Sequence, residues 1–361
     1  MIGRNAPEDG RNDYGQTLFH MRPAAFYGGG TMRKMRWLSL AICLGMVFSL
    51  AACTGTEDQE KPDPNPPGGG TGTEERPEGT LTVDDVYVWT GYPAVEFFPE
   101  FSVASEAEPI TYEYDNTYIE VDGENNLISS KAETAGRTVV TAKSEHFSTE
   151  FNVYYSPVDK SGSWYDTSAY VSYAQTLSRL CAQEGTDGRT TVFLGDSFFD
   201  TRYFWTNFDS YYEGMDALCC GISSTTSYDW ETLASVVLGD LVPANIAIHI
   251  GTNNFYDDHM DHIETTAALQ RLFLVLHDLY PETNIYYFSI TQRLDSSYAT
   301  MVDIANESMQ AWCEGRDWIT WLDTSSELTV DKLKDGIHPK LENYNVFTEA
   351  LEEARMPLYL K

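Results

Sequence analysis

Residues 190–197 read Thr-Thr-Val-Phe-Leu-Gly-Asp-Ser, an apolar run that leads directly into a glycine, an aspartate and a serine. We predict a short strand over residues 190–194, because a brief apolar run without helical period is typical of a buried strand. Ser197 then lies between a strand and a helical stretch, on a tight turn that exposes its hydroxyl. The backbone N–H groups at the start of such a helix favour negative charge.

The same alternation of apolar strands with helical patterns continues through the C-terminal half of the chain. We predict the remaining strands at residues 216–220, 245–250, 284–290 and 319–322. Between the third and fourth strands, apolar side chains recur at helical spacing from Leu269 to Leu279, and Pro281 stops that helix. Strand–helix alternation implies a parallel sheet with helices on both faces. We therefore expect a three-layer αβα domain over residues 164–361.

Polar residues with complementary chemistry follow four of the five predicted strands. Ligands of such sheets bind beyond the carboxyl ends of the strands, and Ser197, Gly221 and Asn253 follow the first three strands. Asp335 and His338 follow the fifth strand. A serine hydroxyl needs a base, which an imidazole oriented by a carboxylate supplies. A glycine N–H and an amide side chain can donate hydrogen bonds to an oxyanion.

This ordered set resembles the sequence blocks of the SGNH/GDSL hydrolase superfamily, over about residues 165–361, and the resemblance implies a flavodoxin-like fold for the αβα domain. By that resemblance Ser197 is the nucleophile, and Asp335 and His338 complete a catalytic triad. The resemblance also implies that Gly221 and Asn253 form an oxyanion hole together with the N–H of Ser197. The implied activity is the hydrolysis of esters through an acyl-enzyme, without a cofactor.

The sequence departs from the family pattern at two positions and lacks the motifs of other enzyme classes. Phe198 stands where the namesake motif has leucine, and Asn254 stands where many relatives have aspartate. The G-x-S-x-G elbow of α/β-hydrolases is absent. Neither a P-loop nor a G-x-G-x-x-G motif follows a predicted strand, which argues against nucleotide chemistry.

Charge and one histidine-rich segment bear on partners and metals. The 361-residue chain has a formal net charge of −32, which argues against a nucleic-acid partner, because phosphate binding needs clustered Lys and Arg. Residues 257–262 contain three aspartates and two histidines, His259 and His262. Acidic residues just before a helix also favour the positive end of its dipole. We therefore expect no metal there.

The N-terminal part of the chain has the pattern of a targeting segment. Residues 33–36 read Arg-Lys-Met-Arg and precede an apolar run that ends in Leu-Ala-Ala-Cys. This resembles a bacterial lipoprotein signal, which implies a signal peptide over residues 32–52 and a lipid on Cys53. The protein would then be exported, periplasmic or at the cell surface, and held at the membrane by that lipid alone. We interpret residues 1–31 as an extension upstream of a mis-assigned start.

Two further segments precede the αβα domain. Residues 53–80 are rich in Pro, Gly and acidic residues and are typical of a tether. Residues 81–157 contain short alternating apolar runs separated by turn residues, which predict a small antiparallel β-sandwich. Residues 126–128 and then 135–142 resemble a bacterial immunoglobulin-like module, whose implied role is that of a spacer or a weak adhesive domain.

Aromatic and polar residues near the predicted site bear on the substrate. Trp205, Tyr211, Tyr212 and Asn254 are candidates for substrate contacts, because aromatic faces can stack on sugar rings. We expect a small ester or an acetylated glycan as substrate, and favour a carbohydrate O-acetyl esterase. A lipase, lysophospholipase or thioesterase remains an alternative, as does an inactive glycan-binding or adhesive surface protein. The pairing of Cys181, Cys219, Cys220 and Cys313 and the oligomeric state stay open.

Overall fold

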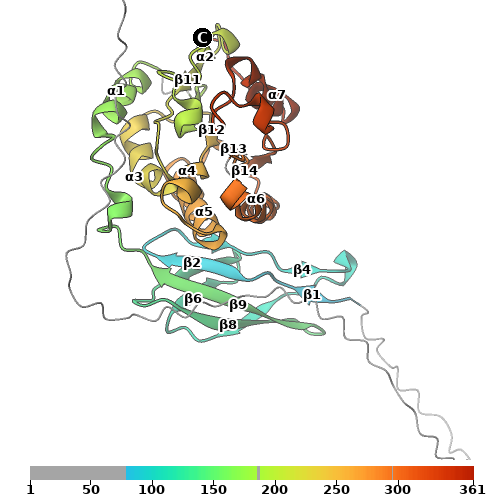
Figure 1. The fold of residues 1–361 in the computed structure, drawn as a ribbon. Helices are drawn as coiled ribbons and strands as arrows, with labels where there is room; N and C mark the ends of the chain where they lie inside the picture. Colours follow the sequence, from blue (N-terminus) through green and yellow to red (C-terminus); the bar gives the residue numbers. More distant parts are fainter. Residues whose placement is uncertain (1–78, 185–187, 295) are drawn as a thin grey trace, which may run out of the picture. The chain divides into compact units, whose positions relative to one another are not determined.

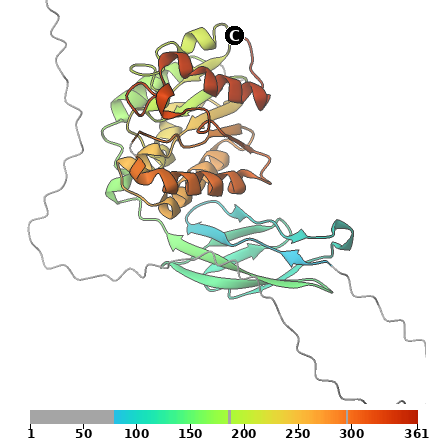
Figure 2. The ribbon, with the colours of Figure 1, turned by 45° about the vertical axis from the view of Figure 1, so that its right-hand side comes forward.

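The computed structural model describes residues 79–184, 188–294 and 296–361 (Figures 1 and 2). The predicted extension at 1–31, the signal peptide at 32–52 and the lipid site at Cys53 lie outside the described residues, as does nearly all of the predicted tether. None of the described helices is long and apolar enough to cross a bilayer.

The first described part is built from short strands around an apolar core. The strands are β1 (Leu81–Thr82), β2 (Val86–Thr90), β3 (Val95–Glu96), β4 (Glu100–Phe101), β5 (Thr111–Tyr114), β6 (Ile119–Asp122), β7 (Leu127–Ser130), β8 (Gly136–Lys143) and β9 (Ser148–Pro157). Along β9 every second side chain is buried from Phe151 through Val153 to Tyr155, as expected for a strand with one face on a core. The alternation in the sequence reflects this one-sided burial.

The strand pairing differs from the purely antiparallel arrangement that we expected. The larger sheet has the order β3-β7-β2-β9-β8-β5, with β6 paired to β7, while β1 pairs with β4. Strands β8 and β9 form a long antiparallel hairpin, but β2 runs parallel to both β9 and β7. Parallel pairing needs a long connection rather than a tight turn. Long stretches of chain that contain other strands separate β2 from β7 and from β9, so local turn signals could not reveal its direction.

The second part contains a five-stranded sheet whose neighbouring strands are all parallel. Its strands are β10 (Thr191–Gly195), β11 (Ala217–Cys219), β12 (Asn245–His249), β13 (Asn284–Phe288) and β14 (Ile319–Leu322). They lie in the order β11-β10-β12-β13-β14. This is the doubly wound order 2-1-3-4-5, and the predicted parallel sheet with five strands is confirmed.

Helices cover both faces of this sheet. They are α1 (Val171–Cys181), α2 (Phe208–Tyr211), α3 (Ser227–Leu238), α4 (Thr252–Tyr256), α5 (His262–Leu279), α6 (Ala299–Cys313) and α7 (Asn345–Glu353), with short 3-10 turns at Ser163–Tyr165, Ser197–Phe199, Ser296–Tyr298, Val330–Lys332 and Leu341–Asn343. Figure 1 shows α7 on the opposite side of the sheet from α1 and α3. Alternate strand residues therefore enter two cores, with Phe193 and Phe288 packing toward α7 and Val192 and Ile246 toward α3 and α5.

A buried polar network joins the turn after β2 to α3 and α5. Tyr92 donates a hydrogen bond to Glu231, and the hydroxyl of Tyr165 donates to the same carboxylate oxygen at 3.2 Å. The other carboxylate oxygen of Glu231 lies 3.3 Å from the Arg271 guanidinium. Burial together with the Glu231 charge raises the pKa of Tyr92. The first described part is therefore attached by specific polar contacts as well as by the chain itself.

The four cysteines of the described part carry free thiols. Cys181 and Cys220 bring their sulfur atoms to 3.9 Å from each other in the core between α1 and β11. Cys313 is buried, and Cys219 donates to the carbonyl of Phe199. Small, apolar packing explains all four positions.

Candidate active site

Ser197 lies on a turn that only a glycine-containing sequence can make. Strand β10 ends at Gly195, whose φ is +134°, and a Cβ placed there would come to 1.9 Å from the carbonyl oxygen of His249. Residues 197–199 then form a 3-10 turn, which the Asp196 side chain caps by accepting the N–H of Phe198 at 3.0 Å. Glycine and aspartate therefore hold the serine at the carboxyl end of the sheet.

Three predicted residues meet in a continuous line of hydrogen bonds. The Oγ of Ser197 lies 2.7 Å from Nε2 of His338, and Nδ1 of the same ring lies 2.9 Å from Oδ2 of Asp335. The other oxygen of Asp335 accepts the backbone N–H of Ile337 at 3.0 Å and of His338 at 2.8 Å. Because a carboxylate only accepts, Nδ1 carries the proton and Nε2 faces the serine hydroxyl as an acceptor. The ring is held in the tautomer that a general base needs.

The protonation states of the pair suit that role. Burial lowers the pKa of His338, against the opposing effect of Asp335, so the ring is neutral at neutral pH. Burial on its own raises the pKa of Asp335, but the hydrogen bonds from the backbone and ring of His338 outweigh it and lower that pKa. Asp335 is therefore ionised and able to stabilise an imidazolium.

Asn253 follows β12, the strand that pairs with β10, the strand before Ser197. Gly251, with φ of +117°, turns the chain after β12, and Asn253 lies in the first turn of the helix. Its amide nitrogen donates to the carbonyl of Thr225 at 2.9 Å, and its amide oxygen accepts from Arg293 at 2.7 Å. An amide nitrogen has two hydrogens, so one remains for a further acceptor.

Gly221 lies at a close approach of two backbone segments. A Cβ at this position would come to 2.3 Å from the backbone carbon of Phe199, so only glycine fits. Burial raises the pKa of the thiol of Cys219, two residues before Gly221. The backbone of Gly221 therefore adjoins the Ser197 turn.

Two residues near His338 were not among the predicted site residues. Phe204 stacks on the His338 ring with 3.6 Å between centroids and 21° between planes. Arg293 reaches Asn253 from the segment after β13. The rule that sites lie beyond strand ends could have found Arg293, because it follows the one strand that contributed no predicted residue.

Three of the predicted substrate contacts occupy other places. Trp205 and Tyr212 are buried in the core between the sheet and α7, and Trp205 stacks on Tyr344. Asn254 is also fully buried, where its amide bonds the N–H and the hydroxyl of Ser227 at the start of α3. These three expectations are corrected, because aromatic packing and helix capping account for the residues. Tyr211 is half-buried against the same core.

The segment 257–262 serves the start of α5. Asp261 caps this helix by accepting the N–H of Glu264 at 2.8 Å, within a capping box. His259 lies 3.1 Å from the hydroxyl of Tyr298. Within the described ranges no group of three or more metal-ligating side chains converges.

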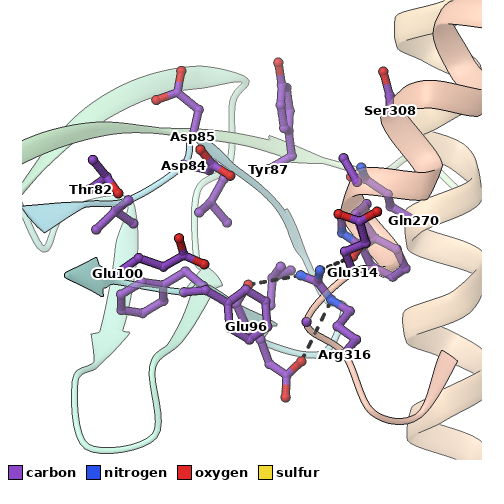
Figure 3. A pocket seen from close by; sticks show the side chains of 18 residues that line it. Thr82, Asp84, Asp85, Tyr87, Glu96, Glu100, Gln270, Ser308, Glu314 and Arg316 are labelled. Atoms are coloured by element: carbon purple, nitrogen blue, oxygen red, sulfur yellow. Dashed lines mark hydrogen bonds and ion pairs between the residues drawn. The ribbon is translucent and has the colours of Figure 1, made fainter. Parts of the chain in front are cut away.

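A separate cavity of about 490 Å³ contains none of the predicted site residues (Figure 3). Segments around β1 to β4 line one side of it, and residues of α5 and α6 line the other. In Figure 3 the guanidinium of Arg316 faces Glu96, whose carboxylate lies 3.8 Å from it. Arg316 also donates to the backbone carbonyl of Trp312. Its charge is therefore satisfied within the protein.

No known protein family matches the sequence, and no curated protein is similar to it. Among solved structures, a GDSL-like lipase from Bacteroides thetaiotaomicron is similar at 18% identity and a TM-score of 0.43, over 53% of this chain and 97% of that one. A member of the lipolytic G-D-S-L family from Veillonella parvula matches at 15% identity and a TM-score of 0.40, over 46% and 97%. A catalytic mutant of an acetylxylan esterase from Geobacillus stearothermophilus matches at 17% and 0.38, over 46% and 94%. At such TM-scores, the interpretation of the site rests on its own geometry.

Proposed function

We propose that this chain is a serine ester hydrolase that forms an acyl-enzyme on Ser197. The observation that carries the proposal is the unbroken line of hydrogen bonds from Ser197 through the ring of His338 to the carboxylate of Asp335. Serine, histidine and aspartate linked in this order activate a hydroxyl for attack on a carbonyl, on whichever fold they occur.

The proposed reaction has two halves. The Oγ of Ser197 attacks the ester carbonyl while Nε2 of His338 takes its proton, and Asp335 stabilises the imidazolium that forms. His338 then returns the proton to the departing alcohol, which leaves an acyl ester on Ser197. Water then attacks this ester while His338 takes its proton. His338 passes that proton to the departing oxygen of Ser197, so the carboxylic acid is released and the serine is regenerated. The N–H groups of Ser197 and Gly221 and the free amide hydrogen of Asn253 are the proposed donors to the oxyanion.

We propose a small acyl group, and acetyl esters of carbohydrates as the favoured substrate class. Ser197 and His338 each expose only 8% of their surface, and Phe204 covers one face of the His338 ring. Little room at the reacting atoms favours an acetyl group over a long chain. This reading differs from a lipase or lysophospholipase, whose acyl chain needs an extended apolar groove.

We propose further that the chain is an exported lipoprotein anchored through Cys53. The support is the sequence alone: basic residues, an apolar run and a small-residue motif before that cysteine. Mass spectrometry of the purified mature protein tests this proposal. The expected result is a diacylglyceryl-modified N-terminal peptide that begins at Cys53, and an unmodified peptide running through this residue contradicts it.

Activity is tested with p-nitrophenyl esters of increasing acyl length, with a fluorophosphonate probe and with acetylated polysaccharides. The wild type should hydrolyse the acetyl ester fastest, react with the probe and release acetate. Ser197→Ala should lose all three, whereas Ser210→Ala, an exposed serine on α2, is the matched control. A wild type that reacts with no ester and no probe contradicts the enzyme proposal and favours an inactive binding protein. Faster hydrolysis of long acyl chains favours a lipase.

A further inference from the structure

Arg293 is a cation in direct contact with a proposed oxyanion donor. It lies five residues after the end of β13, and its Nη2 donates to the amide oxygen of Asn253 at 2.7 Å. Its guanidinium lies 4.2 Å from the ring centre of Tyr256 on α4.

Burying the guanidinium of Arg293 costs free energy, because a buried charge loses its hydration. The Nε of Arg293 is buried and has no hydrogen-bond partner within the described part of the chain. Burial lowers the pKa of Arg293, while Asp257, Asp196 and Asp335 act in the opposite direction. Arginine nevertheless keeps its charge in proteins. A positive charge is therefore held permanently at the edge of the Ser197 site.

The contact determines how the Asn253 amide is oriented. Arginine only donates and a backbone carbonyl only accepts, so the side facing Arg293 must be the amide oxygen and the side facing Thr225 must be the nitrogen. Donation to an amide oxygen also polarises the amide and makes its N–H groups better donors. The remaining Asn253 hydrogen is thereby both aimed and strengthened.

We propose that Arg293 is a positioning residue of the oxyanion hole, which orients and polarises the Asn253 amide and places a positive charge near the developing oxyanion. This inference rests on the proposed ester hydrolysis. Lysine cannot replace arginine fully, because a single ammonium on a flexible stem lacks the planar fork that packs on Tyr256.

The same charge acts on the general base. Arg293 disfavours a proton on His338, whereas Asp335 and Asp196 favour one, and burial has the largest effect. Removal of the arginine charge should therefore raise the pKa of His338. The acidic limb of the pH profile of kcat/KM should then move to higher pH, which the loss of a merely structural contact would not cause.

The test compares Arg293→Met and Arg293→Lys with the wild type, and uses Arg179→Met as a control on the exposed face of α1. Loss of a whole oxyanion donor costs about 10²–10³-fold in kcat, so we expect about 10–100-fold for Arg293→Met, with KM within about threefold. Arg293→Lys should recover part of the loss, and Arg179→Met should be unchanged. Thermal melting verifies that the variants fold.

A second measurement does not depend on turnover. The side-chain amide resonances of Asn253, identified by their loss in Asn253→Asp, should shift in Arg293→Met, and the imidazole pKa of His338 should rise. Unmoved resonances overturn the proposal even if the enzyme is active. A higher KM for anionic esters with unchanged kcat also overturns it, and assigns Arg293 to substrate binding. An inactive wild type contradicts the proposed function instead, while the resonances still report on the contact.

Discussion

Two histidine–aspartate pairs lie close together in the αβα domain, and each has a hydroxyl on the far side of the ring. In one, His338 lies 2.9 Å from Asp335 and 2.7 Å from the Ser197 hydroxyl. In the other, His249 lies 3.4 Å from Asp196 and 3.1 Å from the hydroxyl of Thr291. The residue types are nearly the same, but the environments are different.

Access and geometry distinguish the two pairs. His249 and Thr291 expose no surface at all, whereas Ser197 and His338 each retain 8%. The ring of Phe198 stacks on His249 at 4.1 Å and lies 5.5 Å from His338, so it separates the pairs. A buried pair can brace a strand end, but only the accessible pair can meet a substrate. Chemistry is therefore assigned by exposure and by short, aligned hydrogen bonds, and not by residue type.

The largest expected effect comes from replacing each of the two histidines with asparagine, one at a time. His338→Asn should lower kcat by about 10⁴-fold or more, because the serine loses its base, while the melting temperature changes little. His249→Asn should retain the chemistry and lose stability, by about 2–3 kcal/mol for a buried ring with two polar partners. Ester hydrolysis and thermal melting measure the two effects. A loss of equal size in both variants breaks the distinction between the pairs.

The two aspartates should separate in the same way. Asp335→Asn removes the acceptor that fixes the His338 tautomer, so kcat should fall by about 10²–10⁴-fold. Asp196→Asn weakens the cap on the Ser197 turn, so we expect a lower melting temperature and a smaller loss of kcat. Steady-state kinetics with p-nitrophenyl acetate measure the change in kcat, and unfolding curves of both variants measure the change in stability. A greater kinetic loss for Asp196→Asn contradicts it.

Adjacent amides offer a sharper version of the comparison. Asn253→Ala removes a proposed oxyanion donor, and kcat should fall by about 10²–10³-fold, or about 3–4 kcal/mol in the barrier. Asn254→Ala leaves the start of α3 without its partner, and should cost about 1–2 kcal/mol of stability with a smaller kinetic effect. The same kinetic assay and melting curves measure the two effects. Identical behaviour of the two variants shows that neither amide faces the reaction.

The smallest expected effect is a displacement of the pH profile. The pKa of His338 is lowered from its ordinary value, chiefly by burial, so the neutral, active ring persists below pH 6.5. The acidic limb of kcat/KM should therefore fall below about pH 6.5. The same shift stabilises the fold above the unfolded pKa, and that contribution is lost as pH falls through the folded pKa. An acidic limb of kcat/KM with its midpoint above pH 6.5 contradicts a His338 pKa that is lowered by burial.

Much of the αβα domain could be predicted, because its strands are apolar throughout and because apolar residues recur at helical spacing between them. The five strands and their parallel direction followed from that pattern, and Ser197, Asn253, Asp335 and His338 followed from their places after strand ends. The pattern could not distinguish an aromatic residue in the core from one that contacts the substrate. Trp205 and Tyr212 were misplaced for that reason, since burial depends on the position of α7, more than a hundred residues away in sequence.

The sequence by itself determined which residues end up at the carboxyl edge of the sheet, because glycine turns and strand lengths are local properties. Only the tertiary structure decided that β2 runs parallel to β9, that Asn254 caps α3 and that Arg293 reaches Asn253. The tertiary structure also decided that the His338 pair is accessible to a substrate and that the His249 pair is fully buried. These outcomes depend on contacts between segments far apart in the chain, and such contacts have no local period that a sequence can display.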